Sequence, residues 1–412
     1  MRQIIIISFT FPPQGGIGGR RWAKFSKYFK REGLNVKVYT APFRNNSSPW
    51  KEDTIGVEVV EIETGFPRVI RFGVSTILDK IKYRLALYQL RKQVNGNFYD
   101  HSSMWHANLI PALKKEDLNS SVIIASAGPF SYLADLIPLK KEFPELKLIA
   151  DFRDPWTTNK TAFGYSDLPD TRLKVEQEKE KQVVDDFDAI VSVASPMTDY
   201  FKSISNGQGI DKFHTILNGY DPEDYKFLPR SPKKSTSTLK IAFVGTLYNK
   251  TKQGLKALCV ALRETDLVVE VTFCGDMTDE ARELLSQLNQ VKLLGKVSGT
   301  EARSIINESD VAMLLLTDDL TYSFSTKFCE YISMKKPIWI ISKEGETPAF
   351  IVDHEIGVHS NPNKKDVLDG LQTLVQSISK LNYESFDARP FQIQKLSDDY
   401  VRIIRNLESK GE

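Results

Sequence analysis

The chain has 412 residues, of which 41% are hydrophobic and 26% are charged, and its formal net charge is +2. This composition is ordinary for a globular protein with two domains, and the small net charge excludes a general affinity for nucleic acid. The 3 cysteines, Cys259, Cys274 and Cys329, are isolated among apolar neighbours, which excludes a disulfide framework and a cysteine metal site and indicates a reducing compartment.

The N-terminal apolar stretch "MRQIIIIS" is too short for a secretory signal peptide, and proline, glycine and arginine residues follow it at once. No run in the chain approaches the ~18–20 apolar residues that a membrane span needs. The 5 histidines are scattered without metal-ligand spacing. We therefore expect a soluble, cytoplasmic protein, bound to a membrane at most peripherally, with no metal or other cofactor.

Strand-length apolar runs alternate with amphipathic helical patterns along the first half of the chain. Residues 21–33 predict a helix that buries Trp22, Phe25, Tyr28 and Phe29 on one face. Strands are predicted at 3–8, 35–40, 57–62, 121–127, 146–152 and 189–195. This alternation is typical of a parallel sheet covered by helices on both faces.

The pattern restarts after a segment that is poor in apolar residues. Residues 228–240 are rich in proline, serine and lysine, and they predict a linker. Further strands are predicted at 239–245, 268–275, 291–297, 311–317 and 337–342. The expected fold class is therefore α/β, with two facing Rossmann-like parallel-sheet domains and a ligand cleft between them.

A glycine-rich loop, "PQGGIGGRRW" (13–22), follows the first predicted strand and has three interpretations. It can be a tight strand-to-helix turn, for which glycine is permissive. Gly16 and Gly18 match a dinucleotide fingerprint, but Arg21 stands at its last glycine position and no acidic residue ends the second strand. We favour the third interpretation, a loop whose backbone N–H groups face a phosphate at a helix N-terminus.

The stretch "YSFSTKFCEYISMKKPIW" (322–339) is the most informative part of the second half. Ser325 or Thr326 is expected to cap a helix that follows the preceding strand. Lys327 then lies in the first turn, where the helix dipole disfavours a cation unless a bound anion shares the site. Glu330, one turn further on, carries a carboxylate suited to a ribose diol. The alternative is a solvated Lys327–Glu330 pair, worth only ~0.2–0.5 kcal/mol.

Several segments together resemble the retaining glycosyltransferases of family 4, which have the two-domain GT-B fold. They are "PPQGGIGGRR", "NGYDPEDY" (218–225), "IAFVGTLYNKTKQG" (241–254), and "SDVAMLLL" followed by "FSTKFCEYISMKKPI". The resemblance covers nearly the whole chain, with the motifs in the family's order. It implies that a sugar is transferred from a nucleotide-diphosphate sugar to an acceptor, with retention at the anomeric carbon.

The resemblance also implies roles for residues of the donor site. Glu330 would hold the ribose, and Gly15 and Gly16 would lie beside the phosphates. The family often carries a second glutamate eight positions before the ribose glutamate, where this chain has Tyr322. Contacts to the sugar or the phosphates would instead come from the segment formed by Ser323, Phe324, Ser325 and Thr326, through its backbone N–H groups.

A basic pair usually neutralises the diphosphate in this family, because the diphosphate gains negative charge as the glycosidic bond breaks. The first member is commonly an arginine directly after the glycine that corresponds to Gly245, and this chain has Thr246 there. Lys250 or Lys252 is expected to supply the second member, and Lys327 to supply the missing charge.

The GT-B fold also implies a domain organisation. We expect an N-terminal, acceptor-side domain at 1–215, a hinge at 216–238 and a nucleotide-sugar-binding domain at 239–389. The terminal segment, 390–412, is expected to return as a helix to the first domain, as is usual in this fold.

The segment "LKLIADFRDPWTTN" (146–159) places Asp151, Arg153 and Asp154 at the end of a first-domain strand. In the resembling family this region lies near the acceptor and the reacting carbon, so we expect Asp154 or Arg153 to contact the acceptor or the donor sugar as part of the catalytic site. The alternative is a structural turn in which Arg153 pairs with a neighbouring aspartate. No catalytic base is assigned, because retaining transferases of this fold commonly lack an obvious nucleophile.

Basic and aromatic residues are interleaved over residues 66–93, where Asp79 is the acidic residue. One interpretation is a core-facing helix with a solvated basic face. The other is an interfacial segment that rests on anionic lipid, which would suit a lipid-linked acceptor. Nucleic acid is the less favoured partner for this segment, since the rest of the chain adds no further basic surface.

The sequence therefore predicts a glycosyltransferase that moves a sugar from a nucleotide-diphosphate sugar to a glycan or lipid-linked acceptor, in cell-surface polysaccharide assembly. Two alternatives stay open. A nucleotide-sugar epimerase on the same scaffold would turn over the donor without an acceptor. A non-catalytic nucleotide-sugar-binding protein would never release free nucleotide diphosphate.

Overall fold

The computed structural model describes residues 2–14, 17–42, 48–159, 164–207, 209–226, 238–247, 249–317 and 323–409. Gly15, Gly16 and Tyr322 lie outside the described residues, as does most of the expected linker. The chain divides into two compact units, one formed by Met1–Leu217 with Leu396–Glu412 and the other by Asn218–Lys395.

The first unit is built on a parallel sheet of seven strands in the order β3-β2-β1-β4-β5-β6-β7. The strands are β1 (Gln3–Ile7), β2 (Val36–Thr40), β3 (Glu58–Glu61), β4 (Ser121–Ala127), β5 (Lys147–Phe152), β6 (Ala189–Ser192) and β7 (Phe213–Thr215). Every residue of the central strand β4 is buried, as expected for a parallel sheet covered on both faces.

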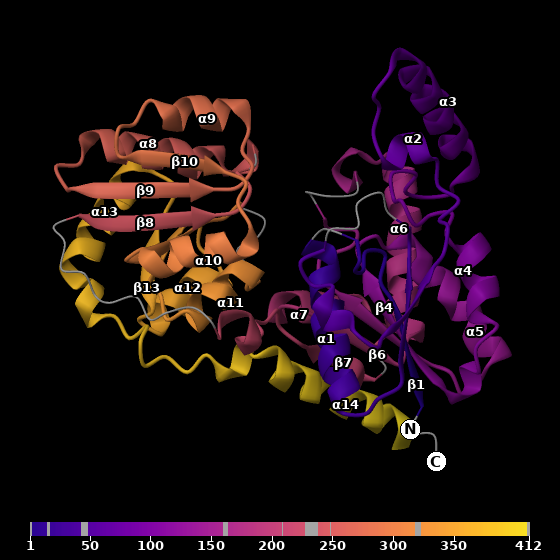
Figure 1. Ribbon diagram of the computed structural model, residues 1–412. Coiled ribbons are helices and arrows are strands. Elements are labelled where there is room, and N and C mark those ends of the chain that lie inside the picture. Colours follow the sequence, from indigo (N-terminus) through magenta and orange to yellow (C-terminus); the bar gives the residue numbers. More distant parts are fainter. Residues whose placement is uncertain are drawn as a thin grey trace. The chain divides into compact units, whose positions relative to one another are not determined.

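Helices surround this sheet (Figure 1). They are α1 (Arg20–Arg31), α2 (Arg68–Arg71), α3 (Ile77–Gln93), α4 (His106–Leu113), α5 (Ile137–Glu142), α6 (Asp170–Asp186), α7 (Ser195–Ile204) and α14 (Ile393–Ser409). Among the described residues, no helix combines the length and the apolar character that a membrane-spanning helix requires.

Helix α1 forms where the apolar residues recur at helical spacing. Trp22, Phe25, Tyr28 and Phe29 are all buried, as their spacing predicts. The chain leaves the helix through Gly33, whose φ of +75° is a left-handed conformation that glycine adopts without strain. The helix start that follows the glycine loop is therefore anchored by an aromatic face.

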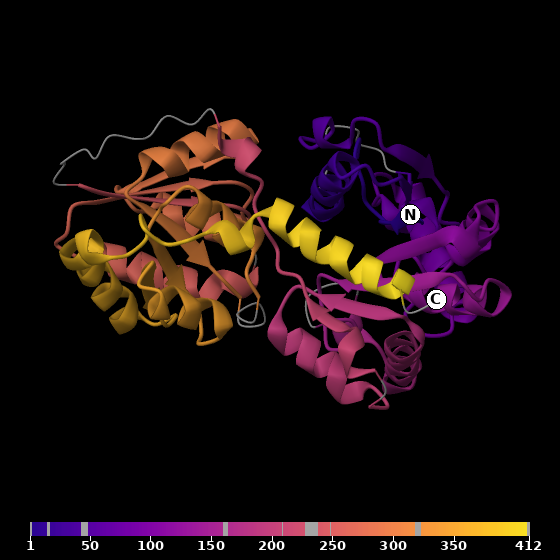
Figure 2. The ribbon, with the colours of Figure 1, turned by 90° about the horizontal axis from the view of Figure 1, so that it is seen from below.

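Helix α14 packs against the same aromatic face and lies alongside the first unit in Figure 2. Tyr400 of α14 is fully buried, and its ring centroid lies 5.5 Å from that of Trp22 and 5.4 Å from that of Phe25. The C-terminal helix thereby completes the core of the first unit, although it is distant in sequence.

The second unit is built on a parallel sheet of six strands in the order β10-β9-β8-β11-β12-β13. Its strands are β8 (Leu239–Val244), β9 (Val269–Cys274), β10 (Val291–Gly295), β11 (Val311–Leu315), β12 (Ile338–Ile341) and β13 (Gly357–Ser360). Its helices are α8 (Lys252–Glu264), α9 (Asp279–Ser286), α10 (Gly299–Glu308), α11 (Thr326–Ser333), α12 (Glu346–Asp353) and α13 (Lys364–Ser377).

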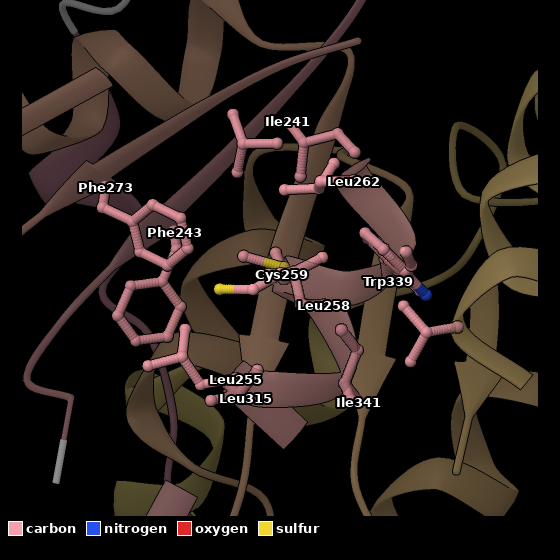
Figure 3. Packing of buried hydrophobic residues seen from close by; sticks show 14 of the residues in the cluster. Ile241, Phe243, Leu255, Leu258, Cys259, Leu262, Phe273, Leu315, Trp339 and Ile341 are labelled. Carbon is pink, nitrogen blue, oxygen red and sulfur yellow. The ribbon is translucent and has the colours of Figure 1, made fainter. Parts of the chain in front are cut away.

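One face of this second sheet packs against α8 in a continuous apolar core (Figure 3). Phe243 and Phe273 meet on neighbouring strands with their ring centroids 5.5 Å apart. Leu258 and Cys259 of α8 are buried beside them. All three cysteines of the chain are buried, and none of them forms a disulfide bond. This packing holds the carboxyl end of β8 in place, which matters for the candidate site.

The predicted fold class is confirmed, since both units are Rossmann-like parallel sheets surrounded by helices. Every predicted strand is present, but β6 ends at Ser192 rather than at residue 195, because Ser195 begins α7. Strands β7 and β13 were not predicted. Both are short edge strands with polar residues, so neither has the apolar run by which a buried strand is recognised in a sequence.

Candidate functional site

The candidate site of the second unit lies where the strand order reverses, between the neighbouring strands β8 and β11. In an open parallel sheet the loops at such a point diverge, and ligands bind outside the carboxyl ends of the strands. The loop after β8 begins with Gly245 and Thr246, and the segment after β11 leads into α11. Both segments were predicted from the sequence to contact the donor.

Gly245 occupies a position that only glycine fills without strain. Its φ is +145°, and a Cβ atom there would overlap the side-chain nitrogen of Lys327. Gly275, which follows β9, has a φ of +127°, and a Cβ atom there would overlap the carbonyl of Gly245. Because Gly245 and Gly275 lack a Cβ, the Lys327 side chain can lie against the backbone of Gly245, and the backbones of the two glycines can lie close together.

Lys327 lies in the first turn of α11, as predicted, with its ammonium group against Gly245. The nitrogen is 5.1 Å from the centroid of the Phe243 ring, a cation–π contact. Burial lowers the pKa of Lys327 to about 8, although the Glu330 carboxylate opposes that shift. A cation held beside a helix N-terminus and partly withdrawn from water is suited to bind a phosphate.

The start of α11 is fixed by three hydrogen bonds. The Ser325 hydroxyl caps the helix by accepting from the Phe328 N–H at 3.2 Å, which confirms the predicted capping residue. The Asn218 side-chain amide donates to the Phe324 carbonyl at 3.1 Å, and the Thr347 hydroxyl donates to the Ser323 carbonyl at 2.9 Å. The Asn-Gly-x-Asp motif at 218–221 therefore positions this segment within the second unit.

Glu330 follows Lys327 by one turn of α11 and is partly buried. Thr326 is the first residue of the helix, and Ser323, Ser325 and Thr326 are partly exposed, whereas Phe324 is buried. The phenyl ring of Phe324 stacks on that of Phe328, with 4.9 Å between the centroids. The structure thus brings Lys327, Glu330 and the preceding segment together at one edge of the sheet.

The two other candidate cations lie in the segment after β8. Lys252 is exposed and forms an ion pair of 2.6 Å with Glu280 of α9, and Lys250 is exposed in the short 3₁₀ helix Asn249–Thr251. Thr246 is partly exposed. Because Lys252 has an acidic partner and the Lys327 ammonium lies against Gly245, Lys327 is better placed than Lys252 to meet an anion there.

In the first unit, Arg153 connects three loops at the carboxyl edge of the sheet. Its guanidinium donates to the Gly18 carbonyl at 2.7 Å and to the Gly128 and Ala127 carbonyls at 3.2 and 3.5 Å. The alternative in which Arg153 pairs with a neighbouring aspartate is therefore wrong. Asp154 is partly buried at the same edge.

The neighbouring aspartate pairs instead with an arginine that is distant in sequence. Arg21 of α1 donates to the two oxygens of Asp151 at 3.1 and 2.9 Å, and the Tyr400 hydroxyl donates to the same carboxylate at 2.9 Å. Arg21 also donates to the Ile216 and Leu217 carbonyls, each at 2.9 Å. Because these groups are buried and mutually paired, they support the site rather than bind a ligand.

Two buried carboxylates of α6 support the loop that follows β5, and they were missed from the sequence. Glu176 accepts a hydrogen bond from Nε1 of Trp156 at 3.1 Å. Glu180, one turn later, accepts from the hydroxyls of Thr157 and Tyr200, and its pKa is raised by burial. Their spacing of four residues was a usable signal only if α6 was known to face this loop.

In the part of the chain that the structure describes, no three His, Cys, Asp or Glu side chains are grouped as metal ligands. The arrangement at Lys327 is chemically suited to a diphosphate, and the carboxylate of Glu330 to hydroxyl groups. Two Rossmann-like units define an α/β protein of the doubly wound class, whose ligands bind outside the carboxyl ends of the strands.

Comparison with known proteins refines this class. Residues 238–377 match the model of the family described as Glycosyl transferases group 1. No protein of curated function matches the chain by sequence. This family match and the fold together support a glycosyltransferase of the GT-B fold.

Solved structures share the fold at low sequence identity. HepE from Anabaena, in complex with UDP and glucose, has a TM-score of 0.63 and 12% identity, over 98% of this chain and 100% of that chain. Sucrose-phosphate synthase from Thermosynechococcus elongatus has a TM-score of 0.67 and 12% identity, over 100% of both chains. A protein of Listeria monocytogenes assigned as a UDP-N-acetylglucosamine 2-epimerase has a TM-score of 0.57 and 10% identity, over 99% and 97%.

Proposed function

We propose that this protein is a retaining glycosyltransferase that moves a sugar from a uridine-diphosphate sugar to a glycan or lipid-linked acceptor, in cell-surface polysaccharide assembly in the cytoplasm. The observation that carries the proposal is the Lys327 ammonium against Gly245 at the point where the strand order reverses. The group 1 glycosyltransferase match covers this site. Uridine is favoured because HepE is described in complex with UDP-glucose.

In this proposal each donor-site residue has a chemical role. Lys327 neutralises the charge that develops on the diphosphate as the glycosidic bond breaks, and the N-terminus of α11 adds its partial positive charge. Glu330 accepts hydrogen bonds from the ribose hydroxyls. The glycines let the phosphates approach the backbone. A lysine supplies the positive charge, so the proposed reaction uses no metal ion or other cofactor.

The first unit is proposed to supply the acceptor side. Arg153 holds the loop that carries Gly18 and the loops after β4 and β5 in a fixed arrangement. It is therefore a positioning residue in this proposal, and Asp154 is the side chain at this edge that we assign to acceptor contact. No catalytic base is assigned.

An epimerase is the second candidate, because the Listeria protein assigned as a UDP-N-acetylglucosamine 2-epimerase shares the fold over nearly the whole chain. The two reactions differ in their need for an acceptor. An epimerase converts the nucleotide sugar alone into its epimer, which NMR of the donor detects. A transferase leaves the donor's stereochemistry unchanged until an acceptor is present.

The first test is the thermal stability of the protein with uridine, guanosine, adenosine and thymidine diphosphates. UDP at 100 times its dissociation constant is expected to add about 2.7 kcal/mol of apparent stability. Glu330→Gln is expected to weaken UDP binding by roughly 10- to 100-fold, because a hydrogen bond to a charged group contributes about 1.5–3 kcal/mol.

The matched control is Glu283→Gln, which removes an exposed carboxylate from α9 of the same unit. This variant should bind UDP as the wild type does. If none of the four diphosphates stabilises the wild type, the transferase proposal is wrong.

We also propose that helix α3 binds an anionic membrane surface, where a lipid-linked acceptor would be presented. Large apolar side chains of α3 are exposed to solvent rather than buried. They are Ile77 (77% exposed), Leu78 (68%), Ile81 (53%), Leu85 (60%) and Tyr88 (57%). At 3.6 residues per turn they occupy an arc of roughly 100° on the helix. Ala86 and Leu90, on the opposite side, are the buried residues of α3.

The charges of α3 favour a lipid headgroup over another occupant of this apolar face. Exposed basic residues lie beside or at the end of the arc, namely Lys80, Lys82, Arg84, Arg91 and Lys92. The acid of the helix, Asp79, is engaged in a capping box with Thr76. Apolar side chains flanked by cations fit the interface of an anionic bilayer. In Figure 1, α2 and α3 lie at one end of the first unit.

We expect the wild type to sediment with vesicles containing 30% phosphatidylserine and to be released as the salt concentration rises. Ile81→Asn with Leu85→Asn should reduce this binding at least 10-fold, because each side chain loses about 1.5–3 kcal/mol of burial. Ile55→Asn is the control, since Ile55 is 79% exposed elsewhere in the same unit. Equal binding to neutral vesicles, or self-association that the double variant abolishes, would contradict the proposal.

A further inference from the structure

Glu346 is a carboxylate at the carboxyl edge of the second sheet that has no assigned role so far. It is the first residue of α12 and follows the loop after β12. Its Oε2 atom is buried and has no hydrogen-bond partner among the residues that the structure describes. Burial raises the pKa of this carboxyl group.

An unpartnered buried carboxylate oxygen is unfavourable for the folded protein. Its loss of water is uncompensated, and the cost is larger when the group is charged. The N-terminus of α12 offsets only part of this cost. Glu346 therefore offers a hydrogen-bond acceptor that no described protein group uses.

The contacts around Glu346 place it beside the donor site. The next residue, Thr347, donates its hydroxyl to the Ser323 carbonyl at 2.9 Å. Phe350, one turn later on the same face of α12, packs on Phe324 and Phe328 with ring centroids 4.9 and 5.8 Å apart. The face of α12 that carries Glu346 is thus turned toward the start of α11.

Both helices begin at the same edge of the sheet, because α11 follows β11 and α12 follows the neighbouring strand β12. Glu346 lies one turn nearer that edge than Phe350. Lys327 occupies the first turn of α11. The carboxylate of Glu346 and the ammonium of Lys327 are therefore presented by adjacent helix starts.

We propose that Glu346 binds hydroxyl groups of the sugar in the donor, by accepting their hydrogen bonds on its unpartnered oxygen. This inference rests on the proposed function. It gives the sugar a carboxylate partner in a chain that has Tyr322 in place of the first glutamate of the resembling family. In this proposal Lys327 binds the diphosphate and Glu330 binds the ribose. Glu346 contacts the sugar, which is the part of the donor that UDP lacks.

The test compares the affinity for UDP with the affinity for UDP-glucose, UDP-galactose and UDP-N-acetylglucosamine by calorimetry. The sugar that binds the wild type best is then used with Glu346→Gln. We expect this variant to bind the UDP-sugar about 10-fold more weakly, while its affinity for UDP stays within about twofold. Glu344→Gln is the matched control, since it removes an exposed carboxylate two residues away.

Each other outcome contradicts the inference in its own way. If Glu346→Gln weakens the binding of UDP as much as the binding of the UDP-sugar, Glu346 binds the nucleotide or only supports the fold. If neither affinity changes, or if no sugar adds affinity to UDP in the wild type, the carboxylate does not bind the sugar. A wild type that binds none of these ligands refutes the proposed function itself. The Tm of the unliganded variant shows that it is folded.

Discussion

Replacement of Lys327 by methionine is expected to lower the affinity for UDP by roughly 10- to 100-fold, since a hydrogen bond to a charged group contributes about 1.5–3 kcal/mol. The ammonium lies against Gly245 at the start of α11, where the proposal places the diphosphate. Transfer should fall further than binding, because the diphosphate gains charge in the transition state. Calorimetry with UDP and release of UDP from the UDP-sugar measure the two effects.

The pH dependence of UDP binding separates a binding role from a structural one. The pKa of Lys327 is about 8, so its charge is present below pH 8 and is lost as the pH rises through that value. From pH 7 upward the terminal phosphate of UDP is already ionised. Wild-type affinity should therefore decline between pH 7 and 9, whereas the affinity of Lys327→Met should be flat over that range.

The unliganded variant provides the control for this prediction. Burial disfavours the charged form of Lys327, so removal of the charge should leave the stability at pH 7 unchanged or higher. The folded pKa is below the ordinary value of 10.5, so this lysine's contribution to stability increases as the pH rises from about 8 to 10.5. The matched control is Lys292→Met, which removes an exposed lysine of β10 that pairs with Glu270. Normal UDP binding by Lys327→Met would contradict the assignment.

Replacement of Asp151 by alanine is expected to destabilise the first unit by about 3–5 kcal/mol, because the buried Arg21 guanidinium would lose its ion-pair partner. The exposed fractions of the two side chains are 5% for Arg21 and 0% for Asp151. Tyr400 would lose the same acceptor. Urea unfolding followed by tryptophan fluorescence, to which the buried Trp22, Trp105 and Trp156 of this unit contribute, measures the change.

Two further variants test the reason for this loss. Arg21→Met combined with Asp151→Leu removes both charges and should recover most of the stability, because no unpaired buried charge remains. Tyr400→Phe removes one hydrogen bond from the carboxylate and should cost only about 1.5–3 kcal/mol. A loss below 1 kcal/mol in Asp151→Ala would show that water reaches Arg21 and that the pair does not hold the unit together.

Much of the fold could be predicted because its signals are local. The apolar runs of β1, β4 and β5, and the helical spacing of Trp22, Phe25 and Phe29, depend on residues that are neighbours in sequence. The capping residue Ser325 and the first-turn position of Lys327 follow from the same short-range rules. These predictions are confirmed by the structure.

The partners of charged residues could not be predicted in this way. Asp151 binds Arg21, which is 130 positions away in the sequence, and Tyr400, which is 249 positions away. Arg153 binds the Gly18 carbonyl across 135 positions. A sequence pattern shows that a charge is present, but the choice of partner depends on which loops the sheet order brings together.

The sequence by itself determined the class of this protein: two α/β units with a cation and a carboxylate at the start of one helix. Only the tertiary structure decided that Arg153 connects three loops, that Glu346 lies beside the start of α11 with an unpartnered oxygen, and that α3 turns its apolar residues outward. The physical reason is that periodicity defines the faces of a helix, whereas packing between distant elements decides which face is buried.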